Sequence, residues 1–204
     1  MSILIKSAYE PQNGAAVLNE ALGRLYHPAE TRSSLRQFKP GATKSGLYHA
    51  VYELAADTVA AGGRLNQAKR SGSRYLLAAE NGVHAAIELE TDPLGTTGTF
   101  KSINDGPFVA GTEQAIALAE ALPDNESYEF SLVRVSALKL WVLWLKPVDA
   151  LQAARFHVIA PAPIGFDTTR PYTEDGLFAI LTPAAQALFK FNPAAGPDTG
   201  DLVG

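Results

Sequence analysis

Hydrophobic positions along this chain follow a helical period in some segments and a strand period in others. Apolar residues recur three and four positions apart over residues 13–26, 29–38, 45–61, 112–122 and 182–191. This spacing predicts amphipathic helices. Asn13 and Thr112 stand at the start of two of them, where a helix N-cap is preferred. Gly62 follows the third segment, and glycine readily adopts the left-handed conformation that ends many helices.

Other segments are short apolar runs, in part alternating, as strands are. They predict strands over residues 2–6, 74–80, 83–90, 99–103, 128–135, 138–146, 156–160 and 177–181. Both faces of the segment 138–146 are apolar, with Trp141 and Trp144 pointing to opposite sides. We therefore expect this segment to be the central strand of a sheet that is covered on both faces.

Tight turns between neighbouring strands are more frequent than a regular alternation of strands with helices. Asn81-Gly82, between two strand-like runs, is the preferred two-residue hairpin turn. This order predicts a single α+β domain over residues 1–191, with a mainly antiparallel sheet and helices packed on it. Residues 192–204 are rich in Pro, Gly, Ala and Asp and are predicted to form a flexible tail.

The predicted hairpin supplies the first candidate site. Its two-residue turn places Arg74 opposite Leu89 and puts Tyr75, His84 and Glu88 on one face. A histidine and a carboxylate within reach of each other can perform general acid–base catalysis, so these three side chains are the candidate catalytic residues. The commoner explanation is the polar, exposed face of an antiparallel sheet.

A second candidate lies in the helix predicted over residues 45–61. His49 and Glu53 are one helical turn apart, and Asp57 extends the row. An imidazole and a carboxylate at this spacing could bind one metal ion. A solvated helix face with a modest His–Glu pair explains the same spacing and is commoner. No further ligand motif accompanies the pair, and we expect no cofactor.

The third candidate is a basic segment. Residues 64–73 are predicted to form a polar link that carries Arg64, Lys69 and Arg70 and is followed by Arg74. These cations could contact an acidic partner or a nucleic acid. Nucleic-acid affinity, however, depends on several phosphate contacts made together, so a solvated loop is the simpler interpretation.

Composition narrows the class of protein. The 204 residues carry a net charge of −4, are 47% hydrophobic and include no cysteine. The charge argues against nucleic acid as the main partner. The missing cysteines exclude disulfides, Cys-ligated zinc and thiol catalysis. No phosphate-binding loop or serine-nucleophile motif is complete. No apolar run has the length of a signal peptide core or a membrane span, so we expect a soluble, cytoplasmic protein without membrane contact.

These observations together predict a non-enzymatic module that binds another protein or assembles with itself. Such a module should expose a large apolar patch or a self-complementary sheet edge. The alternative is an acid–base enzyme of the hydrolase type, or a small-ligand sensor, with a site assembled from residues distant in sequence. An enzyme of this type requires a pocket in which a histidine and a carboxylate lie within hydrogen-bond reach. The sequence identifies no small-molecule ligand.

Overall fold

The computed structural model describes residues 4–6, 10–25, 45–79, 82–122, 126–149 and 151–190. In chain order its elements are β1 (Leu4–Lys6), α1 (Gly14–Leu25), β2 (Ser45–Glu53), α2 (Ala56–Ala60), the 3-10 turn η2 (Leu65–Gln67), β3 (Lys69–Ala79), β4 (Gly82–Thr91), β5 (Gly98–Asn104), α3 (Pro107–Glu120), β6 (Ser127–Val135), the 3-10 turn η3 (Ser136–Leu138), β7 (Leu140–Pro147), β8 (Arg155–Val158) and α4 (Glu174–Lys190). The helix expected over residues 29–38 and the tail over residues 192–204 lie outside the described residues. Among the described helices, none combines the length and the apolar character that a membrane span requires.

The described strands form one sheet in the order β5-β4-β3-β2-β6-β7-β8, and β1 also pairs with β6. Neighbouring strands run antiparallel except at β6, which runs parallel to β1 and β2. The predicted α+β fold with a mainly antiparallel sheet is therefore confirmed. β2 and β6 are parallel neighbours, which a tight turn cannot join, and the chain passes through β3, β4, β5 and α3 between them.

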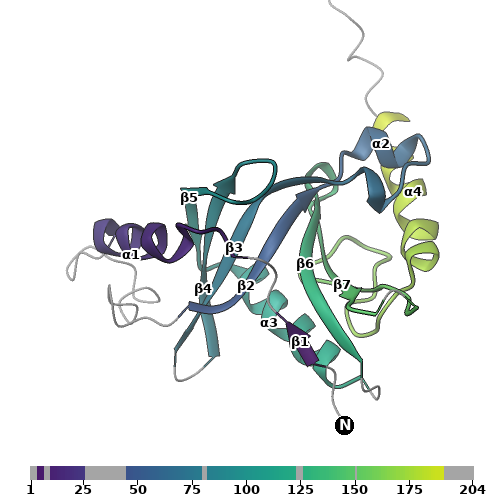
Figure 1. Ribbon diagram of the computed structural model, residues 1–204. Helices are drawn as coiled ribbons and strands as arrows, with labels where there is room; N and C mark the ends of the chain where they lie inside the picture. Colours follow the sequence, from purple (N-terminus) through teal and green to yellow (C-terminus); the bar gives the residue numbers. More distant parts are fainter. Residues whose placement is uncertain are drawn as a thin grey trace, which may run out of the picture.

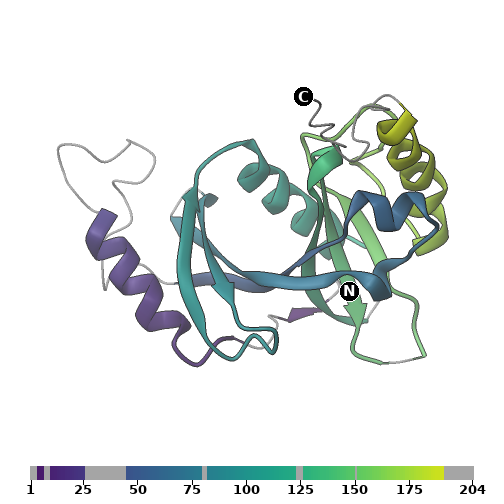
Figure 2. The ribbon, with the colours of Figure 1, turned by 90° about the horizontal axis from the view of Figure 1, so that it is seen from above.

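The sheet is strongly curved, and helices cover both of its faces (Figures 1 and 2). α3 lies on the concave inner face, whereas α1 and α4 lie on the outer face at opposite ends of the sheet (Figure 2). Each helix buries its own apolar cluster: Val109 and Leu143 belong to the cluster under α3, Leu18 and Leu77 to the one under α1, and Phe178 and Val142 to the one under α4.

Residues 45–61 form a strand and a short helix, and not the single helix that their spacing predicts. Both faces of β2 are buried, with Tyr48 in the cluster under α1 and Val51 in the cluster under α3. Apolar residues then occur at nearly every position, and a helical stripe can be selected from such a run although the chain is extended. Gly62 follows the helical part with a φ of 88°, as its position predicts.

The strand expected to be central is β7, and it lies second from the edge of the described sheet, beside β8. Its two faces are nevertheless both buried, with Leu143 in the cluster under α3 and Val142 in the cluster under α4. Trp141 and Trp144 pack on opposite faces, as predicted. A continuous apolar run therefore indicates coverage on both sides and does not reveal the position of a strand within its sheet.

The last described element is a single helix. The strand expected over residues 177–181 and the helix expected over residues 182–191 are replaced by α4, which runs through Pro183 without a break. Glu174 and Asp175 lie in its first turn, where negative charge is favourable. Its buried side chains recur at helical spacing along one face, and they are Leu177, Phe178, Leu181 and Ala185.

Candidate functional site

The register of the β3–β4 hairpin decides which candidate residues meet. The pair next to the turn is Ala79–Gly82, so Gly82 belongs to β4 and not to the predicted Asn81-Gly82 turn. Together with a bulge between the pairs Leu77–Ala85 and Ala78–Val83, this places Arg74 opposite Glu88 and not opposite Leu89. A shift of one residue exchanges the two faces of a strand. Tyr75 therefore packs on the outer face under α1, away from Glu88 on the inner face.

The shared face predicted for Tyr75, His84 and Glu88 is thus wrong for the pair Tyr75 and Glu88. The exposed-sheet alternative is also wrong for these two, because Tyr75 is 0% and Glu88 5% exposed. His84 lies in β4, and its side chain is outside the described part of the structure.

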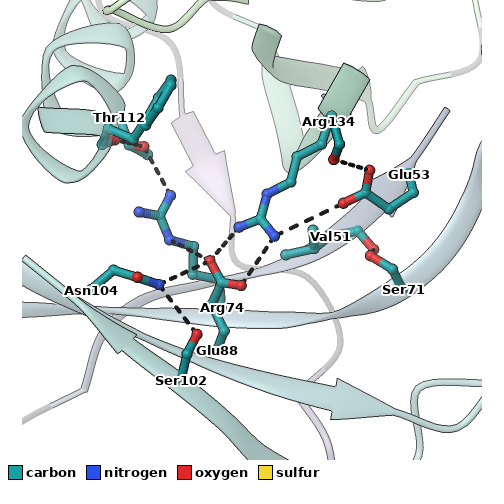
Figure 3. Close-up of polar contacts among 11 residues, drawn as sticks. Val51, Glu53, Ser71, Arg74, Glu88, Ser102, Asn104, Thr112 and Arg134 are labelled. Atoms are coloured by element: carbon teal, nitrogen blue, oxygen red, sulfur yellow. Dashed lines mark hydrogen bonds and ion pairs between the residues drawn. The ribbon is translucent and has the colours of Figure 1, made fainter. Parts of the chain in front are cut away.

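Polar side chains form a row across the inner face of the sheet. Ser102 on β5 lies opposite Glu88 on β4, Glu88 opposite Arg74 on β3, and Arg74 opposite His49 on β2. Arg74 and His49 are fully buried in this row. Cross-strand neighbours on one face lie close enough to interact, and Figure 3 shows the Glu88 carboxylate between the guanidinium groups of Arg74 and Arg134.

The side chain of Arg134 reaches this row from β6 and binds Glu88. Its guanidinium group binds Glu88 with two hydrogen bonds, one from Nη1 to Oε2 at 3.0 Å and one from Nη2 to Oε1. The Nε of Arg74 lies 3.7 Å from the same Oε1. Asn104 approaches this carboxylate from β5 at 3.5 Å. Two buried cations therefore share one buried carboxylate, and we call His49, Arg74, Glu88 and Arg134 the ionic cluster.

α3 covers the ionic cluster with Thr112 and Phe108. Thr112 was expected to cap this helix, but α3 begins at Pro107, and Thr112 is buried in its second turn. Its hydroxyl group accepts a hydrogen bond from Nη1 of Arg74 at 3.0 Å and donates one to the carbonyl oxygen of Phe108. A threonine in that place is therefore a partner for a buried cation and not a helix cap.

Trp141 forms the cover of the cluster on the side of β7. The centre of its ring lies 4.0 Å from Cζ of Arg134 and 5.0 Å from Cζ of Arg74. Phe108 stacks on the indole with ring centres 4.4 Å apart. The negative face of an aromatic ring attracts a guanidinium group, and this attraction is stronger where water is excluded.

The electrostatics of the cluster keep its histidine neutral. Burial, together with the charges of Arg74 and Arg134, holds the pKa of His49 well below its ordinary value. Its ring packs on Phe130 at 4.8 Å, and neither ring nitrogen has a hydrogen-bond partner. Burial lowers the pKa of Arg74 to about 10, so its guanidinium group stays charged at neutral pH. The cluster therefore carries more positive than negative charge.

Glu53 lies at the rim of the cluster. Because residues 45–53 are extended, His49 and Glu53 do not lie on the predicted helix face, and Glu53 is half-buried while His49 is sealed in the core. Its carboxylate lies 4.0 Å from Nη1 of Arg134 and accepts a hydrogen bond from Oγ of Ser136 at 2.9 Å. Within the described residues no group of three His, Cys, Asp or Glu side chains could hold a metal ion.

The basic candidates do not form one patch. The segment expected to be a link continues into β3, which begins at Lys69, and a bulge at Ser71 turns Arg70 and Arg74 to opposite faces. Arg70 binds Tyr48 on the outer face. Arg64 lies 3.4 Å from an oxygen of Asp175 at the start of α4.

Two cavities open along α2. The larger, of about 1010 Å³, is lined by residues 61–67 together with Thr58, Trp144, Glu174 and Asp175. The smaller, of about 450 Å³, is lined by residues 53–56 together with Thr58, Gln67, Lys69, Ser136 and Ala137. Thr58 and Gln67 line both cavities, so the two lie side by side, and we call the two together the α2 groove. Glu53 connects this groove to the ionic cluster behind it.

Comparison with protein-family models, with curated protein sequences and with solved structures found no match to this chain. Its function must therefore be argued from the geometry alone. The structure brings together one residue from each group singled out in the sequence: His49, Arg74 and Glu88.

Sequence reasoning missed Arg134, Trp141 and Thr112. Arg134 carried a usable signal, because it is a charge near the end of the apolar run 128–135, and arginine is almost never fully buried unless it is paired. Its partner could not be named from sequence, since Glu88 lies on a strand two positions beyond the neighbouring β2.

Proposed function

We propose that this chain is a non-enzymatic module that binds an extended segment of a partner protein in the α2 groove. The observation that carries the proposal is the pair of neighbouring cavities of about 1010 and 450 Å³ beside α2, which share Thr58 and Gln67 in their walls. Small-molecule sites enclose most of their ligand in one well-formed pocket of about 300–1,000 Å³. Two neighbouring open cavities suit a peptide segment better, because successive side chains of one segment can enter both.

The walls of the groove favour recognition of an extended chain. Residues 61–67 contribute the glycine pair Gly62 and Gly63, so main-chain groups are accessible in the larger cavity. Charged side chains line both cavities, with Lys69 and Glu53 in the smaller and Arg64, Glu174 and Asp175 in the larger. Polar groups at separate points along a groove fix the register of a bound segment.

Catalysis has weaker support than binding. An acid–base enzyme needs a histidine near a carboxylate in a pocket. Of the histidines whose side chains are described, His49 and His157 are both buried, and their ring nitrogens have no hydrogen-bond partner. The described walls of the α2 groove contain a hydroxyl–carboxylate pair, Ser136 and Glu53, without a histidine beside it.

Self-assembly also has weaker support than binding of a different partner. The amide of Asn13 exchanges two hydrogen bonds of 2.8 Å with the main chain of Gly98, which occupies the start of the β5 edge. A bulge places the extra residue Lys101 in the same strand. Bulges and lysines on edge strands oppose edge-to-edge pairing. The most exposed of the large apolar side chains among the described residues, Leu94, Leu151 and Ile164, lie in separate loops.

The test is selection from a random peptide library displayed on phage, with the full chain immobilised. Gln67→Arg places a longer, charged side chain in the wall that both cavities share. Gln114→Arg makes the same substitution on the exposed surface of α3. We expect selected peptides to lose about ten-fold or more in affinity for Gln67→Arg, which corresponds to 1.4 kcal/mol, and to bind Gln114→Arg like the original chain. Failure to select any peptide, or equal loss in both variants, would refute the proposal.

A further inference from the structure

The ionic cluster is short of one negative charge. Among the described residues, Arg74 and Arg134 are the two buried arginines, and Glu88 is the one buried carboxylate. Nη2 of Arg74 and Nε of Arg134 have no hydrogen-bond partner. Buried charges are normally paired, because removing an ion from water is costly. The cluster therefore attracts a further anion.

Glu53 supplies part of that missing charge, but only loosely. Its carboxylate remains 4.0 Å from the nearest nitrogen of Arg134, its side chain is 38% exposed, and Ser136 holds its other oxygen. An ion pair of this length in partial contact with water contributes little to stability. Glu53 can turn into solvent without leaving an unpaired buried group of its own.

Arg134 does not need to move when Glu53 leaves. The two hydrogen bonds to Glu88 hold its guanidinium group from one side, and the ring of Trp141, 4.0 Å away, holds it from another. Figure 3 shows Arg134 between Glu88 and Glu53. A cation whose position is already fixed loses little conformational freedom when it binds an anion.

Lys69 places a second cation at the same point. It is the cross-strand neighbour of Glu53, and both residues line the smaller cavity of the α2 groove. With Glu53 turned away, a group in this cavity meets Lys69 in the wall and Arg134 behind it.

We infer that a carboxylate of the bound partner segment displaces Glu53 and pairs with Arg134 and Lys69. This inference rests on the proposed peptide-binding function and names the chemistry read at one end of the groove: an aspartate, a glutamate or a chain terminus. Glu53 acts as an internal substitute for that carboxylate. It thereby disfavours the binding of segments that lack a carboxylate.

The first experiment tests whether a carboxylate binds at Arg134. The full chain, labelled with ¹⁵N in its arginine side chains, is titrated with acetate and separately with inorganic phosphate, with chloride holding the ionic strength constant. The Nε–Hε signal of Arg134 reports binding, and an Arg134→Lys spectrum identifies it. We expect saturable movement of this signal with acetate. Movement that is absent, or that chloride reproduces, overturns the inference.

Two substitutions, each of an exposed or half-buried residue, should change the affinity for acetate in opposite directions. Glu53→Gln removes the internal competitor and should tighten acetate binding about two- to five-fold, the range of a partly exposed ion pair. Lys69→Gln should weaken it by a similar factor. Glu20→Gln, on the exposed face of α1, is the matched control and should change nothing. Weaker or unchanged binding in Glu53→Gln would contradict the displacement of Glu53.

Peptides separate this inference from the function on which it rests. Selected segments that bind the groove but tolerate replacement of their acidic residue by its amide would overturn the inference and leave the proposed function intact. Acetate binding at Arg134 without any peptide bound in the groove would overturn the proposed function, and with it the assignment of the carboxylate to a partner segment, while the carboxylate site itself would stand. Phosphate binding far tighter than that of any acidic peptide would assign the site to a free anion and overturn the inference in its present form.

Discussion

Glu88 is the side chain on which the ionic cluster depends most. It is 95% removed from solvent and lies between two guanidinium groups that are themselves 0% and 7% exposed. Glu88→Gln keeps the size of the side chain and removes its charge. The amide oxygen can still accept a hydrogen bond from Arg134, but its NH₂ group faces donors, and two buried cations are left without a counter-ion.

The cost follows from the distances. At 3.7 Å and an effective dielectric constant of about 20, one carboxylate–guanidinium attraction amounts to about 4 kcal/mol. Removing one partner from a buried ion pair typically costs about 3–5 kcal/mol. We expect Glu88→Gln to lower the free energy of unfolding by that amount, which is a large part of the roughly 5–15 kcal/mol that stabilises an ordinary domain.

Urea unfolding at pH 7, followed by far-UV circular dichroism, measures this loss. Glu20→Gln is the control, because its ion pair with Arg24 is exposed and should contribute less than about 1 kcal/mol. Adding Arg134→Gln to Glu88→Gln should recover part of the loss, since one uncompensated cation is removed with it. A loss in Glu88→Gln no larger than in Glu20→Gln would show that this carboxylate is not buried between two cations.

Three further predictions address other parts of the fold. Burial lowers the pKa of His157 to about 4, so below about pH 6.5 the unfolded chain takes up a proton at this residue while the folded chain does not. His157 should therefore contribute about 2–3 kcal/mol to the loss of stability between pH 6.5 and pH 4.5, in addition to any contribution of His49, and His157→Leu should remove that contribution in urea titrations. Asn13→Ala should cost about 1–2 kcal/mol by removing two hydrogen bonds to Gly98, and should increase concentration-dependent association in sedimentation velocity by freeing the β5 edge. In Gly111→Ala the new Cβ would lie 1.9 Å from a main-chain oxygen, so thermal unfolding should show a loss of about 3 kcal/mol, whereas Gly23→Ala, with open space around it, should stabilise α1 by up to about 1 kcal/mol.

Local patterns predicted most of the strands and the class of fold. The antiparallel hairpin of β3 and β4, the paired runs that became β6 and β7, and the opposite faces of Trp141 and Trp144 all depend on neighbours in sequence, and they are confirmed. The predicted turn at Asn81-Gly82 is not, because Gly82 pairs with Ala79 as the first residue of β4. Predictions failed where both faces of a segment are covered. β2 and α4 are rich in apolar residues on more than one side, and periodicity then no longer separates a strand from a helix.

The neighbours of the candidate site residues could not be predicted from the sequence. Sequence singled out His49, Arg74 and Glu88 in three unrelated groups, each with a role that assumed the wrong neighbours. Only the position of the turn together with a bulge in the hairpin places Arg74 beside Glu88, and only the order of the strands places Arg134 near both. Neither a bulge nor the order of strands in a sheet can be predicted from the spacing of apolar and polar residues.

The sequence by itself determined that this chain is an α+β protein with a mainly antiparallel sheet, because turn residues and strand periodicity are local properties. Tertiary structure alone decided which charges are buried together. A buried cation must find its partner across strands, and the pairing of those strands depends on curvature, on bulges and on the helix that fills the concave face. The ionic cluster and the groove in front of it are therefore properties of the folded chain and not of any segment of it.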